Sequence, residues 1–534
     1  MVSLPPFLVE ETLNGRKWRY AELPGVEVLS RCADDITSRL IETQERVHRL
    51  FALLVPPSLQ LDLSTPHALI FYDDDIQPET QAMLERLLRS SAAESPAEPA
   101  RSRSAASPPR TSAKFLPNLW LADRDAFTVF SIVRDDNLEA DRLALSQDYV
   151  SYLLVNRTPA LPTWFTAGIL MLYENTALER GELTIGRLAW PDDLRSSSTE
   201  NAEAPAALQP LAAFFAGELP PRRGAIDGPH RWQWQAALFV RWALDGKDAP
   251  RRAALWRFAE RAAQTTVTEA LFRECFGLGY ATALDQMEEY LPGATKHFLT
   301  LRLTGAAAPP PFQLRDATFV EVARIKGDWE RMEVNYLRSH YPQLAPKYLE
   351  QAQRTLAHAY ERGTRDPRLL AVTGLCDVDA NNNVAARDHL EAAAREGELR
   401  PRAWFELARL RFAALSDSAT GNEKLSATQV ASVLQPLFKA RALHPPLPEV
   451  YELIADVWTR SAAAPTRLHL AVLDEGVRLF PHRDQLVLHA AELNAQHGFP
   501  DAASVLVDVG LRFARDAAVR EKLAALRQRL DGTR

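Results

Sequence analysis

The sequence predicts an α+β region, built from a mixed sheet and helices, followed by an all-α region of repeated helical hairpins. Strand-like segments cluster before residue 134, and helix-like spacing dominates from residue 137 to about residue 290. Beyond that point, a Pro-Arg dipeptide recurs at residues 367 and 401 and opens an apolar helix each time. A chain of 534 residues is too long for one hydrophobic core, so we expect more than one domain.

The strand signals predict two β-hairpins within one mixed sheet. KWRYAELPGVEVLSRC indicates two strands around a Pro-Gly turn, with alternating apolar residues that suit a half-buried strand. A helix capped by Asp34 or Asp35 follows, and HALIFYDDD indicates the next strand. FLPNLWLADRDAFTVFSIVRDD predicts the second hairpin, with ADRDA as the turn between residues 119–121 and 127–133.

A low-complexity tract rich in Ser, Ala and Pro covers residues 90–114. It has almost no apolar content to bury, so we expect a disordered insertion, and strand signals on both sides place it within a domain. GAAAPPPFQL, residues 305–314, predicts a linker. The expected domains are therefore residues 1–304 and residues 315–534.

Between the strands and the linker, the spacing of apolar residues predicts five helices. Their expected ranges are 139–156, 163–178, 229–245, 251–265 and 281–290. GELTIGRLAW, residues 181–190, predicts a short strand that interrupts this helical region.

The two Pro-Arg dipeptides, at residues 367 and 401, are separated by one period of a tetratricopeptide repeat. In AWFELARLRF, the residues Trp404, Leu407 and Ala408 occupy the large, leucine and small positions of the first helix of that repeat. Other segments fit less closely, and LSDSATGNEKLS interrupts the register. We therefore expect a degenerate tetratricopeptide-like solenoid. Stacked hairpins form an extended concave surface, so a protein or peptide partner is expected there.

Composition excludes several other classes of function. The net charge of −7 is small for this length and gives no sign of a nucleic-acid-binding surface. No run reaches the ~18 apolar residues of a transmembrane helix, and the three cysteines lie far apart. The N-terminus lacks the basic and apolar segments of a signal peptide, so the literal expectation is a cytoplasmic protein. A removed signal would leave the same sequence, and the compartment stays open.

The most informative motif is LSQDYVSYLL, residues 145–154, followed by LPTWFTAGIL, residues 161–170. Gln147 and Ser151 are four residues apart, so they share a helix face, about 40° apart around the axis. A gluzincin places two histidines at this spacing to bind zinc, with a glutamate between them that activates the bound water. Its third zinc ligand is a glutamate on the next helix.

The chain resembles the bacterial peptidase MA-like gluzincins that carry a tetratricopeptide tail. Their pattern is HEYxHYLL, a short loop, and then PxWxxEGxAxxxE. Against it, Gln147 and Ser151 replace the histidines, Asp148 replaces the general base and Ala167 replaces the third ligand. The resemblance covers roughly residues 15–300 and implies a zincin-like fold for the N-terminal domain.

Glutamine, serine and alanine are poor replacements for zinc ligands, so zinc is predicted to be lost and no cofactor is expected. The predicted function is a catalytically inactive pseudopeptidase that acts as a protein- or peptide-binding scaffold through its helical repeats. Tyr149, Trp164 and Glu174 are candidates for cleft residues, although Trp164 also suits a core position between two helices. One alternative is an active hydrolase that uses Asp148 and Glu174 without zinc. Another is a scaffold in which the helical tail alone carries the function.

Overall fold

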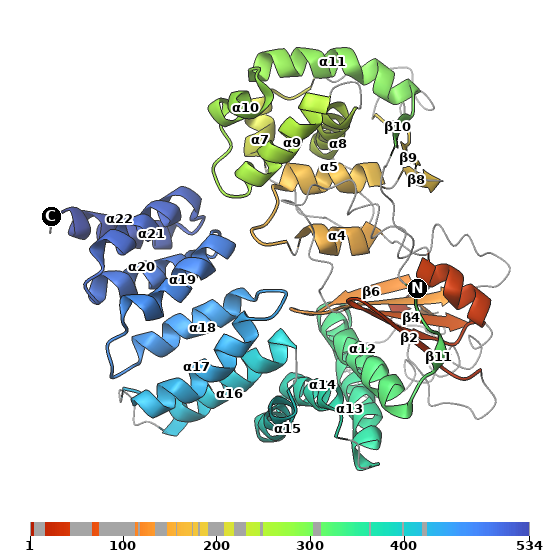
Figure 1. The fold of residues 1–534 in the computed structure, drawn as a ribbon, viewed down its shortest axis with the longest axis vertical. Coiled ribbons are helices and arrows are strands. Elements are labelled where there is room, and N and C mark those ends of the chain that lie inside the picture. Colours follow the sequence, from red (N-terminus) through yellow and green to blue (C-terminus); the bar gives the residue numbers. More distant parts are fainter. Residues whose placement is uncertain are drawn as a thin grey trace, which may run out of the picture. The chain divides into compact units, whose positions relative to one another are not determined.

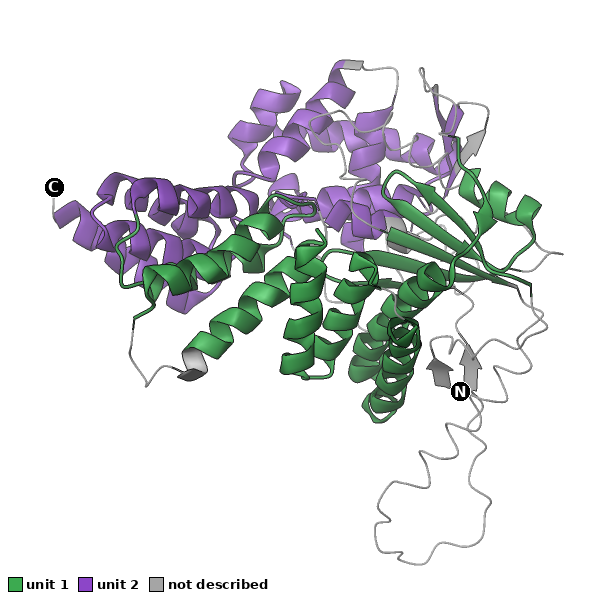
Figure 2. Ribbon diagram, turned by 60° about the horizontal axis from the view of Figure 1, so that its bottom comes forward, with its two compact units in different colours: residues 1–43, 64–144, 310–465 green, residues 44–63, 145–309, 466–534 purple. Residues whose placement is uncertain are grey.

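The structure is a computed structural model that divides into two compact units (Figure 2). Unit 1 comprises residues 1–43, 64–144 and 310–465, and unit 2 comprises residues 44–63, 145–309 and 466–534. The residues described are 2–4, 16–42, 67–73, 113–115, 118–133, 147–155, 157–173, 175–179, 182–190, 208–217, 231–245, 249–302, 311–362, 365–397, 400–418 and 424–532.

Unit 1 contains a six-stranded mixed sheet in the order β11-β2-β3-β4-β7-β6 (Figure 1). β2 and β3 are antiparallel across the predicted Pro-Gly turn, β3, β4 and β7 run parallel, and β6 is antiparallel to β7. The strands are β2 Arg19–Leu23, β3 Val26–Ser30, β4 His67–Asp73, β6 Asn118–Ala122, β7 Phe127–Val133 and β11 Arg315–Asp316. A separate parallel pair joins β1 (Val2–Leu4) to β5 (Ala113–Phe115). The predicted mixed sheet is confirmed.

Helices cover both faces of this sheet. A helix that begins at residue 34, described to residue 42, buries Ile36 and Leu40 against one face. On the other face, α12 (Phe319–His340) buries Trp329, whose ring stacks on Phe130 of β7 with the ring centres 5.5 Å apart. Because α12 shares this hydrophobic core, the sheet and the first repeat helix form one packed body.

Helical hairpins follow α12 within unit 1. Consecutive helices pack in pairs, α12 with α13, α14 with α15 and α16 with α17, while α12, α14, α16 and α18 form a second set of contacts. The helices are α13 Ala345–Glu361, α14 Pro367–Asp379, α15 Asn383–Arg395, α16 Pro401–Ser418, α17 Ala427–Arg441 and α18 Pro448–Thr459. Each of the two predicted Pro-Arg dipeptides begins a helix. The predicted helical-repeat region is confirmed.

The repeat period also determines where paired helices approach most closely. A Cβ atom added to Gly374 of α14 would lie only 2.7 Å from Cγ of Leu390 in α15. Ala408 occupies the equivalent position one period further on, in α16, and is completely buried. The small residue that the repeat pattern requires therefore lies at a tight helix–helix contact in α14.

Unit 2 combines helices with a three-stranded antiparallel sheet in the order β10-β9-β8. Its elements up to residue 302 are α4 Gln147–Val155, α5 Thr163–Tyr173, β8 Thr176–Glu179, β9 Glu182–Ile185, α7 Leu211–Ala216, α8 Arg231–Leu244, α9 Ala249–Ala262, α10 Glu269–Phe276, α11 Tyr280–Lys296 and β10 Leu299–Arg302. Further along the chain, α20 pairs with α21, and α22 packs on both. The last helices are α19 Arg467–Leu479, α20 Asp484–Gln496, α21 Pro500–Phe513 and α22 Ala517–Gly532.

Two predicted helix ends were wrong. The helix expected at residues 163–178 ends at Tyr173, where the Thr176 hydroxyl donates to the Leu172 carbonyl at 2.7 Å, and β8 then begins. The helix expected at residues 281–290 continues to Lys296, and Pro292 lies inside it. Local apolar spacing did not indicate that the next segment pairs with β9, nor that the helix tolerates its proline.

Other expectations lie wholly or partly outside the described residues. The start of the helix predicted at residues 139–156 is outside them up to residue 146, as is the Ser/Pro-rich tract up to residue 112. The last two residues of that tract begin β5. The predicted linker is described only from residue 311, and Phe312 and Leu314 pack against the core of the sheet. The domain limits stay a prediction.

Candidate binding site at the junction of sheet and hairpins

The turn between β6 and β7 carries two buried aspartates, Asp123 and Asp125, toward the hairpins of unit 1. The Asp123 side chain is 5% exposed and that of Asp125 is completely buried. The turn is closed by the Asp123 N–H, which donates to the Ala126 carbonyl at 2.8 Å. Because both carboxyl groups are buried, their polar atoms must be matched by groups on the helices.

Three arginines bind Asp123. The Nη2 atom of Arg400, just before α16, donates to its carboxylate at 3.0 Å, and Arg331 of α12 and Arg402 of α16 bind the same oxygen. Burial alone would raise the pKa of the Asp123 carboxyl, but the three guanidinium groups hold that pKa well below its usual range. Asp123 is therefore ionised at neutral pH.

Asp125 binds the N-terminus of α16. Its carboxylate accepts a hydrogen bond from the backbone N–H of Arg402 at 2.8 Å and another from Nε of Arg400 at 3.0 Å. The first N–H groups of a helix have no partner within the helix and form the positive end of its dipole. The hairpin tip thus caps a helix that is distant from it in the sequence.

Two more aspartates complete the network. Arg400 Nη1 donates to Asp328 of α12 at 2.8 Å, and Arg331 Nη1 donates to Asp379 of α14 at 2.9 Å. We use the name junction clamp for the seven residues Asp123, Asp125, Asp328, Arg331, Asp379, Arg400 and Arg402. Removing one partner from such a buried network leaves an uncompensated charge and costs about 3–5 kcal/mol. The junction clamp therefore fixes the sheet to α12, α14 and α16.

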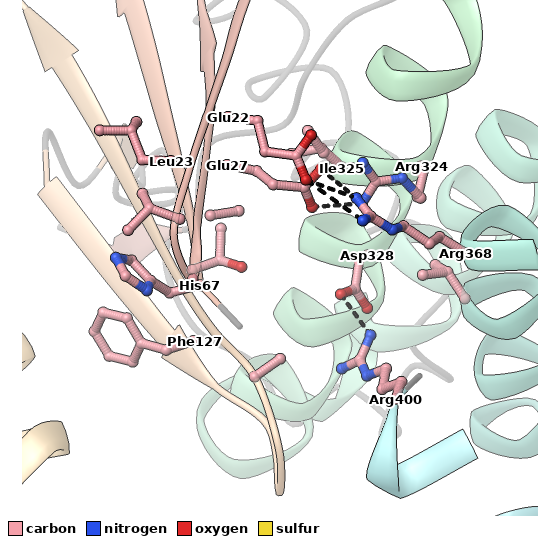
Figure 3. Close-up of a pocket in the computed structure, with 16 residues that line it drawn as sticks. Glu22, Leu23, Glu27, His67, Phe127, Arg324, Ile325, Asp328, Arg368 and Arg400 are labelled. Carbon is pink, nitrogen blue, oxygen red and sulfur yellow. Dashed lines mark hydrogen bonds and ion pairs between the residues drawn. The ribbon is translucent and has the colours of Figure 1, made fainter. Parts of the chain in front are cut away.

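A cavity of ≈ 400 Å³ lies beside the clamp, between one end of the sheet and α12 and α14 (Figure 3). We call it the junction pocket. Its lining includes His67 and Phe127 of the sheet, Ile325 of α12 and Val372 of α14. In Figure 3 the His67 and Phe127 side chains extend to the side of the strands away from α12. Apolar side chains thus form much of its wall, as in most sites that bind small molecules or peptide side chains.

Ion pairs of unequal burial line the rim of the junction pocket. Glu27 binds both terminal nitrogens of Arg324, and the two side chains are only 20% and 10% exposed. Burial raises the pKa of Glu27, but Arg324 outweighs this effect and lowers it overall. Arg368 is 50% exposed and donates to Glu22 at 3.4 Å and to Glu27 at 3.2 Å. An exposed pair of this kind is worth only about 0–1 kcal/mol, so Arg368 can exchange Glu22 for a ligand carboxylate.

The residues predicted from the gluzincin-like motif lie on α4 and α5, which pack together, except Glu174, which is outside the described residues. Ser151 is half-buried on α4, and Ala167 is buried on α5. Trp164 is also buried, and its ring stacks on Phe258 of α9 with the ring centres 5.4 Å apart. The position of Trp164 is therefore that of a core residue. The side chains of Gln147, Asp148, Tyr149 and Glu174 lie outside what the structure describes.

The residues that form the junction were present in the sequence but were not recognised as a site. Arg368 and Arg402 are the second residues of the two Pro-Arg dipeptides, and Asp123 and Asp125 are the acids of the predicted ADRDA turn. Two acids on a hairpin tip and arginines at a fixed repeat position are visible in the sequence, but nothing in the sequence pairs these acids with these arginines.

Neither a metal-ligand cluster nor a membrane-spanning helix occurs in the described part of the chain. There, no three His, Cys, Asp or Glu side chains come close enough together to hold a metal ion. None of the described helices combines the length and apolar character needed to span a bilayer. Cys32, Cys275 and Cys376 are buried, and none of the three forms a disulfide.

Comparison with known protein families finds no match for this sequence, and comparison with curated proteins finds none either. Among solved structures, a thermophilic TPR protein of Thermus thermophilus is 16% identical, with 36% of this chain and 97% of that protein covered and a TM-score of 0.24. YrrB, described as a TPR protein with an unusual peptide-binding site, is 15% identical, with 39% and 97% covered and a TM-score of 0.28. These scores are too low to establish a shared fold, so the repeat assignment depends on the helix pairing itself.

Proposed function

We propose that the protein is a non-enzymatic binding scaffold that captures a protein or peptide segment at its helical hairpins, with the junction pocket as one point of capture. The observation that supports this proposal is an apolar cavity of ≈ 400 Å³ whose rim carries one half-exposed, weakly paired arginine, Arg368. A cavity of this size accepts a few apolar side chains of a partner, and Arg368 supplies a contact for an adjacent carboxylate.

The charged groups around the junction pocket favour binding over catalysis. A catalytic acid or base needs a free position from which it can exchange a proton with the substrate. Arg400 and Asp328 instead bind each other within the junction clamp, and Glu27 is held by Arg324. These side chains join separate elements of the fold.

The proposal is tested by selecting a library of short random peptides on the full chain. We expect the selected peptides to share an apolar anchor residue. Because Ala68 lines the junction pocket, Ala68→Phe fills it, and we expect affinity to fall at least ~10-fold. The matched control is Val384→Phe, which adds a comparable ring at a position that is 67% exposed on α15. Peptides that bind the Ala68→Phe variant as tightly as the natural chain would contradict the junction pocket as the capture site.

We further propose that residues 1–304 descend from a gluzincin peptidase that has lost its zinc. Two observations support this origin: α4 and α5 are helices at the two motif segments, and α5 packs on α8, which lies within the range of the resemblance. The test compares zinc content in the natural chain and in the quadruple variant Gln147→His, Asp148→Glu, Ser151→His and Ala167→Glu. We expect zinc only in the variant. Stoichiometric zinc in the natural chain, or a folded variant that binds none, would contradict this origin.

A further inference from the structure

A second apolar groove, of ≈ 390 Å³, lies between α19 and α21 in unit 2. We call it the terminal groove. Val477 of α19 and Leu506 and Phe513 of α21 contribute to its floor, and Gln264, after α9, completes its lining. At its edge, Val505 is 63% exposed, which is unusual among the large apolar residues that the structure describes. An apolar floor with an exposed apolar edge indicates a surface that a partner covers.

Two arginines line the terminal groove at equivalent repeat positions. Arg478 lies in the last turn of α19 and Arg512 in the last turn of α21, one tetratricopeptide period apart. Both are exposed, and neither forms an ion pair or a hydrogen bond with any residue that the structure describes. The other two charges in the lining, Arg467 and Asp474, bind each other. The groove therefore presents two positive charges without a counter-charge among the described residues.

The shape of the groove also limits the conformation of its occupant. The groove lies between two helices, whose backbone groups are already hydrogen-bonded, so it offers no strand edge to which an extended peptide can pair. An occupant must therefore satisfy its own backbone hydrogen bonds, as an α-helix does.

We propose that the terminal groove binds an acidic amphipathic helix of a partner protein. Apolar side chains spaced i and i+4 on one face of that helix pack on the floor, and flanking carboxylates bind Arg478 and Arg512. This proposal rests on the proposed scaffold function and adds the chemical class of the partner. It places a second binding surface on α19 and α21 of unit 2.

The probe is a synthetic helical peptide with leucines at i and i+4 and glutamates beside them, measured by fluorescence anisotropy with the full chain. We expect saturable binding that weakens as salt is added, because charge pairs at an exposed rim are screened. Two matched peptides serve as controls, one with lysine in place of each glutamate and one with the same composition in scrambled order. Both should bind at least ~10-fold more weakly. Equal binding of either control would overturn the proposal, as would no binding of the acidic peptide.

Variants locate the binding surface. We expect Val505→Glu, and separately the double variant Arg478→Gln and Arg512→Gln, to weaken binding of the acidic peptide at least ~10-fold. Ala68→Phe, in the junction pocket, should leave it unchanged. Cations in a last helical turn also stabilise the helix, so melting temperature is measured in parallel. A lower melting temperature with unchanged affinity would assign Arg478 and Arg512 to helix stability alone and overturn the proposal.

Two further outcomes separate the possible occupants and the two sites. If light scattering shows a concentration-dependent dimer that Val505→Glu abolishes, a second copy of the chain covers the groove and the proposal is overturned. If library-selected peptides lose affinity with Ala68→Phe while the acidic peptide never binds, the scaffold function stands and only the terminal groove fails. If the acidic peptide binds the terminal groove while Ala68→Phe leaves the affinity of the library-selected peptides unchanged, the junction pocket is contradicted as a capture site and the terminal groove stands.

Discussion

The helical hairpins next to the sheet and those at the end of the chain use arginines at repeated positions in opposite ways. Arg368 and Arg402 are one repeat period apart, and Arg402 is buried against acids of the sheet and of α14. Arg478 and Arg512 are separated by the same period, yet both are exposed and border an apolar groove. The comparison shows that one repeat scaffold can use its cations to fix a domain of the same chain or keep them at the surface. The surface next to each arginine, and not its position in the repeat, decides whether the arginine fixes a domain or stays exposed.

The largest effect should come from breaking the junction clamp. Asp123→Ala leaves Arg331, Arg400 and Arg402 buried without their shared acceptor, so we expect the free energy of unfolding of unit 1 to fall by about 3–5 kcal/mol. Urea unfolding of the full chain measures this loss. The control is Glu350→Ala, in an exposed i, i+4 pair with Arg354, where about 0.2–0.5 kcal/mol is expected. Comparable small losses in both variants would show that the clamp does not hold the sheet to the hairpins.

A second, pH-dependent effect comes from Glu330, buried on α12. Burial, the largest cause, raises its pKa from 4.5 to about 7, while Lys326 and the polar groups of Gln351 and Thr355 lower it only partly. Between these two pH values the folded chain holds a proton that the unfolded chain has released. Stability therefore falls as pH rises from about 4.5 to about 7, by about 3 kcal/mol, and is unaffected by this group below and above that range.

Glutamine does not titrate, so Glu330→Gln removes the pH dependence of stability that comes from this position. We expect the variant to lose less stability than the natural chain when pH is raised from about 5 to about 7.5, by an amount on the order of 3 kcal/mol. Unfolding curves at several pH values measure the difference, and Glu350→Gln, at an exposed site on α13, should behave like the natural chain. Parallel curves for the natural chain and Glu330→Gln would contradict a raised pKa at Glu330.

Local signals predicted the elements that depend on neighbouring residues. The hairpins formed by β2 and β3 and by β6 and β7 matched the alternation and turn residues of the sequence, and Pro367 and Pro401 marked helix starts. The order of the strands was not predicted, because β3, β4 and β7 pair in parallel although they are separated by long stretches of sequence. Local periodicity identifies an amphipathic strand or helix but not its partner.

The junction could not be predicted for the same reason. Arg331 and Asp123 lie far apart in the sequence, and no local pattern pairs a turn with a helix over such a separation. α12 has an apolar face that looks like that of any repeat helix, yet Trp329 packs against the sheet. The motif on α4 has the spacing of a known active site, whereas the acids and arginines of the clamp occur in sequence contexts typical of surface charges.

A third effect tests the packing within the helical hairpins. An added Cβ at Gly374 meets Leu390 at 2.7 Å, so we expect Gly374→Ala to lower the free energy of unfolding by about 1–3 kcal/mol, despite the higher helix propensity of alanine. The control is Gly293→Ala in α11, where an added Cβ meets nothing within 4 Å and a gain of about 0.5–1 kcal/mol is expected. A gain at both positions would mean that α14 and α15 can separate without cost.

The smallest effect gives the most direct comparison, because Arg368 and Arg402 occupy the same repeat position. Arg368 is 50% exposed and Arg402 is 6% exposed. We expect Arg368→Gln to change stability by about 0–1 kcal/mol, since water replaces its contacts with Glu22 and Glu27. Arg402→Gln leaves Asp123 and Asp379 with fewer buried cations and should cost several times more, about 3 kcal/mol or above. Equal losses in urea unfolding would show that burial does not decide the role of this arginine. A small loss for Arg368→Gln, together with weaker binding of library-selected peptides, would instead identify Arg368 as the arginine that the first hairpins keep for a partner.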